Sequence, residues 1–554
     1  MTLIASAALG LTLSLGLGGC APHPPADPDG LGQITPTEDP YADFTLPVPA
    51  NLYTAWTAPD RSTFSVIDVD LPGYAAPPAG SGYGRYFDQE VTWIQCGGYE
   101  CANVLAPLDW NDPDAQAITL SMKRRPSTQT PALGTLFINP GGPGGSAKDY
   151  VSDYSSTGLE QYDIVGLDPR GSGDSTAVVC GTTAQTDAYF DLDYSPDTDA
   201  EKTLLIAGAR EFAAQCRAGS GRLLDHISTI EAIYDFDMVR RLLGDEKFNF
   251  HGVSYGTYIG SVYAELFPEN TGRMILDAAV NITDKEGVSQ SDGFELALHK
   301  WAQWCAAQNA PATGATPSPS PSPAPEPTGK CSLGATEAEV IAALTAFVAD
   351  LDANPIPVGQ RALTQSYAIT GLALYFYFGA DYYEDMTQVI EYTIATRDGA
   401  NLLYAADLLN SRDTNSWEPM AFAFPAISCL DGSDEGLDAS FAGWKEDAQR
   451  APFFAGFMGP NVTCVVWGTR PAPQIKFSGA GAAPLLVIGG TGDNATPYQY
   501  AEWMAEALES AVLVTRDGVG HGSYDAGSSC IDKIVRGYLT DGTVPQDGTV
   551  CQMD

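Results

Sequence analysis

Short apolar runs bounded by glycine and proline alternate with amphipathic stretches from about residue 90 onward. Such runs predict strands, and apolar residues at three- and four-residue spacing predict helices. Strands are expected in VTWIQCG, AITLSMKRR, GTLFINPGGPGGS, YDIVGLDPRGSGDS, FNFH, RMILDAAV, APLLVIGGTGDNATP and AVLVTRDGVGHGSY. Helices are expected over residues 227–243 and in YQYAEWMAEALES. This alternation predicts an α/β fold, a mostly parallel sheet with helices on both faces.

The pattern changes to helices alone between residues 283 and 418, through ALHKWAQWCAAQ, EAEVIAALTAFVADL, YAITGLALYFYFGA and DMTQVIEYTIATR. An all-helical block that interrupts an α/β pattern predicts an inserted cap over the catalytic edge of the sheet. The core is then divided into residues 86–282 and 419–554. Within the cap, the Pro/Ser-rich loop 311–328 is interpreted as an extended, inert insertion. Tyr375, Phe376 and Tyr377 are interpreted as cap packing rather than as the wall of a pocket.

The first twenty residues, MTLIASAALGLTLSLGLGGC, form an apolar run that ends in small residues, as is typical of an export signal. The end of the run, LGGC, is similar to a bacterial lipobox, in which Cys20 becomes the lipidated first residue. No Lys or Arg precedes the run, so an exported amino terminus without lipid is the alternative. Residues 21–85 are rich in Pro, Asp, Gly and Ala and predict a tether followed by irregular chain on the core. We therefore expect a secreted protein or one held at the outer face of the membrane.

The number of cysteines is consistent with export. Ten remain when Cys20 is set aside, and an even number predicts disulfides made in an oxidising compartment. Their connectivity stays open, although pairing in sequence order would close five short or medium loops. A zinc site is not expected, because Cys96 and Cys101 have the wrong spacing for a zinc ribbon.

The formal net charge of −41 excludes a nucleic-acid partner and disfavours anionic lipid surfaces. We interpret this charge as a source of solubility or salt tolerance, and a field that attracts cationic substrates is the alternative. A hydrophobic content of 44% is ample for a packed interior.

Candidate chemistry begins at Ser254, in the stretch GVSYG between Gly252 and Gly256. A short apolar run precedes it, and a helical pattern follows until Pro268. A strand, a tight turn and a helix are what a nucleophile elbow requires, and glycines remove the Cβ atoms that would clash in the bend. An ordinary turn serine is the alternative interpretation.

A serine nucleophile needs a general base, and the chain has only five histidines. His521 lies in the glycine-rich stretch after the last predicted strand, where a hydrolase of this architecture presents its base. Asp493 follows the preceding strand and is expected to orient the imidazole, with Asp277 as the alternative acid. The order Ser254, Asp493, His521 is that of α/β hydrolases.

Two backbone N–H groups are expected to stabilise a tetrahedral oxyanion. Tyr255, directly after the nucleophile, supplies one. The turn NPGGPGG after the strand TLFI supplies the other, from Gly142 or, as the alternative, Gly141.

The ordered set WIQCGGYECANVLAPLDW, INPGGPGGS, LDPRGSGDS, GVSYGTYIGSVYAELFP, GGTGDNATP and GVGHGSY resembles the proline-iminopeptidase-like branch of α/β hydrolases, most closely its secreted tripeptidyl aminopeptidase group. The resemblance extends from about residue 90 to residue 551. It implies an α/β-hydrolase fold with a helical cap, peptide substrates cleaved from a free amino terminus, and no metal or organic cofactor. The triad and oxyanion roles carry over to Ser254, Asp493, His521, Gly142 and Tyr255.

Two functions compete with an exopeptidase: an esterase or lipase-like hydrolase with the same machinery, and a non-catalytic surface binding protein. Proline iminopeptidases carry a histidine at the start of the glycine turn, where this chain has Asn139 and Pro140. Their amine-binding glutamates have no pattern match here. Candidate amine anchors, each more simply a solvated surface acid, are Asp292, Glu295, Asp381, Glu384 and Asp385.

Overall fold

The computed structural model of the protein describes residues 41, 44–53, 73–308, 331–432, 436–469 and 471–554. The predicted signal segment 1–20 with Cys20, and the Pro/Ser-rich loop 311–328, lie outside the described residues.

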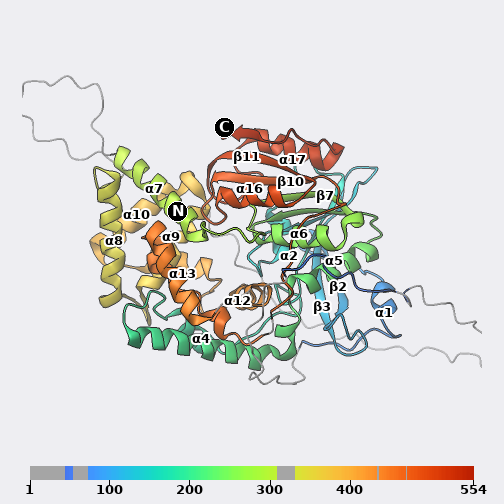
Figure 1. Cartoon of the computed structure of the whole chain (residues 1–554), viewed down its shortest axis with the longest axis horizontal. Helices are drawn as coiled ribbons and strands as arrows, with labels where there is room; N and C mark the ends of the chain where they lie inside the picture. Colours follow the sequence, from blue (N-terminus) through green and yellow to red (C-terminus); the bar gives the residue numbers. More distant parts are fainter. Residues whose placement is uncertain (1–40, 42–43, 54–72, 309–330, 433–435, 470) are drawn as a thin grey trace, which may run out of the picture.

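A large sheet forms the centre of the fold (Figure 1). Its strands, in spatial order, are β1 (Ile94–Cys96), β2 (Tyr99–Pro107), β3 (Ala117–Arg125), β5 (Tyr162–Leu167), β4 (Gly134–Asn139), β6 (Phe248–Val253), β7 (Thr271–Asp277), β10 (Leu485–Gly492), β11 (Ala511–Val519) and β12 (Thr549–Gln552). From β5 to β12 all neighbours are parallel, whereas β1, β2 and β3 pair antiparallel. The predicted mostly parallel sheet is confirmed.

The helices that pack along the sheet and its loops are α1 (Gly84–Phe87), α2 (Ala147–Asp153), α3 (Thr183–Phe190), α4 (Asp199–Ser220), α5 (Thr229–Leu242), α6 (Tyr255–Leu266), α16 (Tyr498–Ala507) and α17 (Ser529–Asp541), with the 3₁₀ turns η1 (Gly221–Asp225) and η2 (Pro268–Asn270). On one face, Val151 of α2 and Val535 of α17 share an apolar cluster with strand residues such as Ile488. On the other face, α5, α6 and α16 bury residues such as Phe236 and Met504. Because both faces are covered, central strands such as β4 are buried almost throughout.

Between β7 and β10 the chain is helical apart from the small hairpin β8 (Ile356–Val358) and β9 (Arg361–Leu363). The elements are α7 (Gln290–Gln308), α8 (Glu337–Ala353), α9 (Gln365–Tyr377), η3 (Gly379–Tyr382), α10 (Tyr383–Thr396), α11 (Ala400–Leu409), α12 (Met420–Asp431), α13 (Leu437–Arg450), α14 (Phe454–Met458) and α15 (Thr463–Val466). Helices α7 to α11 and α14 share their own apolar cluster around Trp301. Helix α12 instead packs into the main core, through Phe422 against Phe212 of α4. In Figure 1 these helices lie beside the sheet, and α4 runs along the lower edge beneath both parts.

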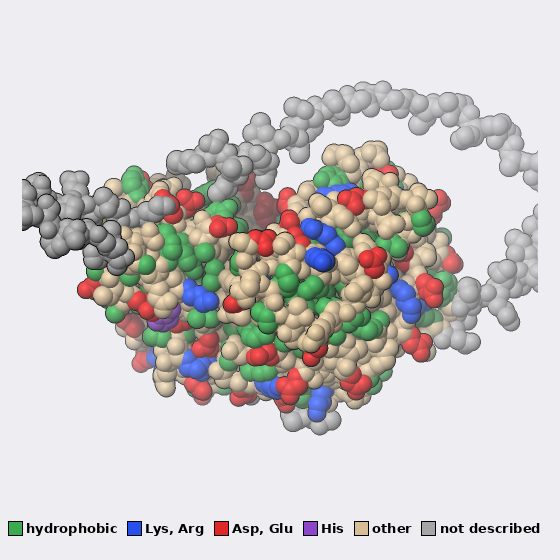
Figure 2. Space-filling model, turned by 90° about the horizontal axis from the view of Figure 1, so that it is seen from above, with side chains coloured by type: hydrophobic (Ala, Val, Ile, Leu, Met, Phe, Trp, Pro, Cys, Tyr) green, Lys and Arg blue, Asp and Glu red, His purple; other side chains and the backbone are tan. Residues whose placement is uncertain are grey.

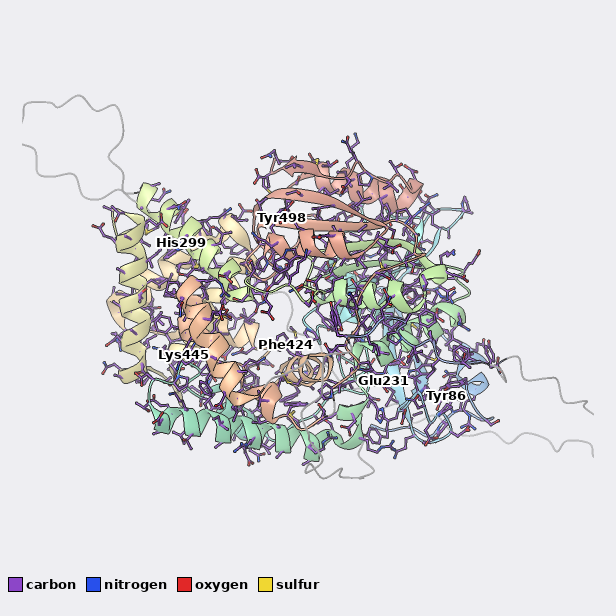
Figure 3. All side chains as sticks on the ribbon, in the orientation of Figure 1. Tyr86, Glu231, His299, Phe424, Lys445 and Tyr498 are labelled. Atoms are coloured by element: carbon purple, nitrogen blue, oxygen red, sulfur yellow. A yellow bond between two sulfur atoms is a disulfide. The ribbon has the colours of Figure 1, made fainter. Side chains whose placement is uncertain are left out.

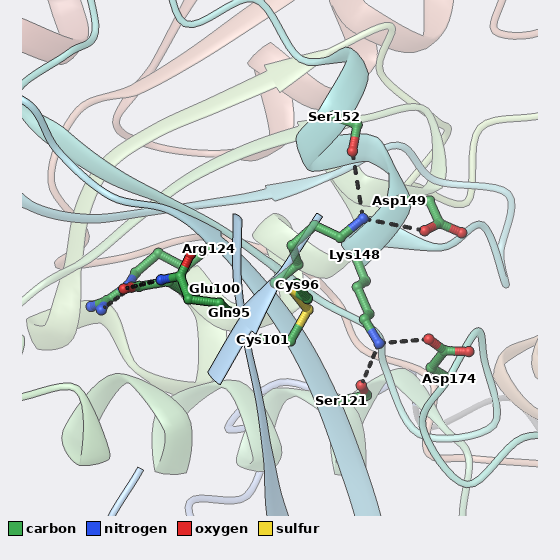
Figure 4. The surroundings of a disulfide bond; sticks show 11 residues. Gln95, Cys96, Glu100, Cys101, Ser121, Arg124, Lys148, Asp149, Ser152 and Asp174 are labelled. Carbon is green, nitrogen blue, oxygen red and sulfur yellow. Dashed lines mark hydrogen bonds and ion pairs between the residues drawn. A yellow bond between two sulfur atoms is a disulfide. The ribbon is translucent and has the colours of Figure 1, made fainter. Parts of the chain in front are cut away.

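Five disulfides connect the ten cysteines in sequence order: Cys96–Cys101, Cys180–Cys216, Cys305–Cys331, Cys429–Cys464 and Cys530–Cys551. The first closes the turn between β1 and β2 (Figure 4), beside the ion pair of Arg124 with Glu100. The last joins α17 to β12, so it ties the end of the described chain to the edge of the sheet. The pairing that the sequence left open is therefore sequential.

A buried ion pair joins the loop after β5 to α5. Arg170, whose side chain has no exposed surface, donates through Nε and Nη2 to the two carboxylate oxygens of Asp235, at 2.7 Å each. Trp110 Nε1 donates to Asp235 Oδ1 at 2.9 Å. The remaining guanidinium N–H groups donate to main-chain carbonyls of Pro107, Leu108 and His226. Every donor is paired, which is the condition under which such a charge is tolerated in a core.

We expect Asp235→Ala to lower the free energy of unfolding by about 3–5 kcal/mol, because the buried Arg170 guanidinium loses the carboxylate that accepts two of its N–H groups and keeps only the more distant Glu231, 3.8 Å from Nη1. Urea denaturation measures the loss. The control is Glu506→Ala, which removes the exposed partner of Lys285 and should cost less than about 1 kcal/mol. Equal losses in the two variants would contradict the role given to the buried pair.

Candidate active site

Ser254 lies at the turn between β6 and α6 with φ 58° and ψ −126°. A positive φ is strained for a residue with a side chain and persists only where neighbouring contacts impose it. The Ser254 N–H donates to the main-chain carbonyl of Asp277 at 2.9 Å, and the Ser254 carbonyl accepts from the N–H and hydroxyl of Thr257. These hydrogen bonds fix the main chain on both sides of Ser254.

The turn closes because two positions lack a side chain. A Cβ added at Gly252 would lie 2.3 Å from the carbonyl oxygen of Gly256, and one added at Gly141 would lie 2.5 Å from the carbonyl oxygen of Val253. Both separations are too short for any real Cβ contact, so a side chain at either position would displace the main chain around Ser254. This arrangement is the strand, turn and helix expected of a nucleophile elbow.

His521 and Asp493 form a hydrogen-bonded pair. His521 Nδ1 lies 2.9 Å from Asp493 Oδ1 and 3.0 Å from Oδ2. The main-chain N–H groups of Ala495 and Thr496 donate to Asp493 Oδ1, which fixes the carboxylate, and its side chain is 1% exposed. A proton on Nδ1 donated to this carboxylate leaves Nε2 free to accept one.

Ser254 and His521 line the same cavity, which has a volume of about 720 Å³. Gly142, the expected oxyanion donor, lies in its wall. Gly141, the alternative donor, already gives its N–H to Asn139 Oδ1 at 2.9 Å. This contact favours Gly142. Tyr255 is the first residue of α6, so its N–H is one of those that a helix leaves without an intrahelical acceptor.

Asp277, the alternative acid, accepts hydrogen bonds from the loop that carries His521, whereas Asp493 binds the imidazole itself. Its Oδ2 accepts from the N–H groups of Ser523 and Tyr524 at 2.9 Å each. Burial alone would raise the pKa of Asp277, but His251, whose Nε2 lies 3.9 Å from Oδ2, and these two N–H groups hold that pKa below its usual value. Because its carbonyl also accepts from Ser254, one residue connects the elbow to the histidine loop.

Three features of the cavity wall are not evident from the sequence pattern. Tyr377, interpreted from the sequence as cap packing, lines the cavity, and its carbonyl accepts from the N–H of His521 at 3.1 Å. Tyr377 also packs against the cap cluster, so it has both roles, whereas Phe376 is buried in that cluster and Tyr375 packs against it as expected. Tyr194, from the segment between α3 and α4, and Phe424 of α12 also line it. Phe424 is labelled near the middle of the molecule in Figure 3.

The candidate amine anchors do not line the cavity. Asp292 pairs with Arg450, and Glu295 accepts from the N–H groups of Phe453 and Phe454. Asp381, Glu384 and Asp385 lie where η3 meets α10. None of the five is placed to meet a substrate ammonium group inside the cavity.

A half-buried acid, Asp431, lies behind the oxyanion candidate Tyr255. Asp431, at the end of α12, accepts from the Thr229 N–H at 2.8 Å and from its hydroxyl at 2.5 Å. The Tyr255 hydroxyl bonds to that Thr229 hydroxyl and lies 3.4 Å from Asp431 Oδ2. Burial raises the pKa of Asp431 to about 6.

One group of His, Asp and Glu in the described residues has the spacing of metal ligands: Asp109, His226 and Glu231. Two guanidinium groups are already close to it. Arg222 Nη2 lies 3.9 Å from Asp109, and Arg170 Nη1 lies 3.8 Å from Glu231. We therefore interpret the group as an ion-pair network at the start of α5.

Comparison with known proteins agrees with this geometry. A family model described as "alpha/beta hydrolase fold" matches residues 134–320, and one described as "TAP-like protein" matches residues 451–551. The serine protease Hip1 of Mycobacterium tuberculosis is 32% identical over 84% of this chain and 91% of its own. The tripeptidyl aminopeptidase of Streptomyces coelicolor is 29% identical over 83% and 85%. Carboxylesterase B of Mycobacterium tuberculosis is 33% identical over 81% and 86%.

Within the described ranges, no helix has the length and apolar character needed to cross a bilayer.

We expect Asp277→Ala to lower kcat/KM at least tenfold, because two buried N–H groups of the histidine loop lose their acceptor, at about 1–3 kcal/mol each. Asp277→Asn keeps an oxygen acceptor and should retain most of the activity. Asp493→Asn, which changes the carboxylate paired to His521, should cost about 10⁴-fold in kcat. If Asp277→Asn were as damaging as Asp493→Asn, Asp277 would be the acid partner of His521 instead.

We expect Asp431→Asn to become more stable relative to the wild type as pH rises from 4 to 7. A folded-state pKa of about 6 lies above the usual Asp value, so the stabilising contribution of Asp431 is complete below pH 4 and is lost as the pH rises through 6. The gain has an upper bound of about 3 kcal/mol. Unfolding free energies of both proteins at pH 4, 5.5 and 7 measure it, and a difference that is constant with pH would contradict the buried, perturbed carboxyl.

Proposed function

Because the chain belongs to the α/β-hydrolase family and carries a TAP-like carboxyl-terminal region, we propose that it is an exported serine exopeptidase that cleaves short peptides from free amino termini. That it is a serine hydrolase of the peptidase type follows from its relatives. The proposed chemistry rests on one observation: a serine on a strained elbow shares a cavity with a histidine that is paired to a buried aspartate. The preference for free amino termini is supported by the TAP-like region and by the relative named tripeptidyl aminopeptidase.

In the proposed reaction, Ser254 Oγ attacks the carbonyl carbon of the scissile bond and His521 Nε2 takes its proton. Asp493 holds the imidazole in the required tautomer and stabilises the imidazolium. The N–H groups of Gly142 and Tyr255 bind the oxyanion, a contribution of about 3–4 kcal/mol per donor in comparable sites. Protonated His521 then protonates the leaving amine. Water, activated by the same imidazole, releases the acyl group from Ser254.

Three observations support short peptides as substrates. The cavity volume of about 720 Å³ is in the range of roughly 300–1,000 Å³ typical of sites that enclose a small ligand. Helices α9 and α12 contribute to its wall, so a long folded polypeptide meets a roof above Ser254. A relative named tripeptidyl aminopeptidase covers most of the chain.

A carboxylesterase is the second candidate, and the cavity wall favours it in one respect. Among the described residues that line the cavity there is no Asp or Glu to bind a substrate ammonium group. An ester substrate needs no such partner, and one relative is named carboxylesterase B.

Export is part of the proposal. Five disulfides are typical of proteins that fold in an oxidising compartment. Lipidation at Cys20 would attach the protein to the outer face of the membrane. The division into core segments 86–282 and 419–554 with a cap at 283–418 also remains a proposal, since the sheet resumes only at Leu485.

We expect the protein to cleave a chromogenic tripeptide amide with a free amino group at least 100-fold faster than its N-acetylated form, measured as kcat/KM. Ser254→Ala should abolish both reactions and also abolish labelling by a fluorophosphonate, while its thermal unfolding stays close to that of the wild type.

Equal cleavage of the free and acetylated amides would remove the exopeptidase assignment. Efficient cleavage of esters with negligible cleavage of amides would establish the carboxylesterase instead. Near-normal turnover by Ser254→Ala would contradict both.

A further inference from the structure

The wall of the active-site cavity is uncharged. The described residues that line it include no Asp, Glu, Lys or Arg, although 18% of the chain is charged. Apart from His521, the ionisable groups in this wall are tyrosines, and burial raises the pKa of Tyr377 and Tyr367 well above their usual value. The wall therefore carries no formal charge at neutral pH outside the catalytic histidine.

Carboxylates next to the wall bind groups of the protein instead of facing the cavity. Asp292 follows the lining residue Ser291 and pairs with Arg450. Glu295 follows the lining residue Phe294 and accepts from two main-chain N–H groups. Many charged side chains lie on the outer surface, where acidic and basic groups are spread over the visible face (Figure 2).

The wall has two kinds of groups. Aromatic rings, among them Tyr194, Phe294 and Phe424, supply apolar surface. Asn410 and Asn461 also line the cavity, and an uncharged side-chain amide can both donate to and accept from the main chain of a peptide. An isolated charge that enters such a site loses its hydration without gaining an opposite charge, at a cost of several kcal/mol.

We propose that this cavity selects substrates whose acyl part carries uncharged side chains, and that it excludes acidic and basic side chains on that side of the scissile bond. The inference rests on the proposed function only in placing the acyl group against Ser254. It concerns substrate side chains. The same wall, in its described residues, offers no counter-charge to the α-ammonium of a free amino terminus either, which is the respect in which it favours the carboxylesterase. The inference applies to peptide amides and to esters alike, because it depends on the wall and not on the leaving group.

The test uses substrates matched in size that differ only in charge: Gln against Glu, and norleucine against Lys, at each acyl-side position of a tripeptide amide and of the corresponding ester. We expect kcat/KM to be at least tenfold higher for the uncharged member of each pair. Protection of Ser254 from fluorophosphonate labelling measures relative binding of the same substrates where turnover is slow. Charged members within twofold of the uncharged ones at every position would overturn the inference.

A charge placed in the wall should reverse the selection. Asn410→Asp keeps the size of the side chain and introduces a carboxylate, so it should raise the Lys-to-norleucine ratio of kcat/KM roughly tenfold at one acyl-side position and lower the Glu-to-Gln ratio. Asn103→Asp is the matched control, because Asn103 is exposed on β2 and outside the cavity wall. It changes the net charge equally and should leave both ratios unchanged.

Failure of this inference differs from failure of the proposed function. Equal rates for charged and uncharged substrates, with dependence on a free amino group intact, would overturn the inference alone. Loss of the free-amine dependence, with the charge selection intact, would overturn the exopeptidase alone. Equal shifts in Asn410→Asp and Asn103→Asp would assign any selectivity to the overall charge of the protein and would also overturn the inference.

Discussion

The site depends on a backbone conformation that the chain does not favour locally. Ser254 has a positive φ, and its main chain is held by the carbonyl of Asp277 on one side and by Thr257 on the other. The same Asp277 binds the N–H groups of two residues that follow His521. The strained serine and the histidine loop are thus positioned by one residue at the end of a central strand. Strain of this kind is stable only because the surrounding sheet is rigid and covered on both faces.

The helical part of the molecule does more than cover the site. Specific hydrogen bonds connect its helices to the reacting groups. Asp431 of α12 binds Thr229 of α5, and Thr229 binds the hydroxyl of Tyr255 next to the nucleophile. On the opposite side, Tyr377 at the end of α9 binds the N–H of His521. A shift of either helix would therefore be transmitted to an oxyanion candidate or to the base. Helices that shape the substrate cavity also fix the groups that react.

The sheet and the reactive residues could be predicted because their signals are local. Runs such as LFI and LLVI are apolar throughout, as is typical of buried parallel strands, and Ser254 and His521 lie in glycine-rich turns that follow strands. The sequence does not predict strand β2, because Glu100, Ala102 and Asn103 are residue types that are depleted in strands, although Ala102 is buried and Asn103 exposed as a strand requires. The cavity wall could not be predicted either. Tyr194, Tyr377 and Phe424 come from distant segments, and only the packing of α4, α9 and α12 brings them together. Tyr377 has the same apolar surroundings in sequence as Phe376, which is buried, so periodicity alone does not distinguish them.

Each of the five disulfides joins a cysteine to the next one along the chain, with separations between 5 and 36 residues, and no bridge encloses another. When a polypeptide crosses a membrane from its amino terminus, every cysteine of this set meets its partner before the following pair emerges. Correct oxidation can then proceed in the order of translocation, without an isomerase having to undo crossed pairs. Under the proposed export, the arrangement allows each disulfide to form while the rest of the chain is still being threaded out of the cell.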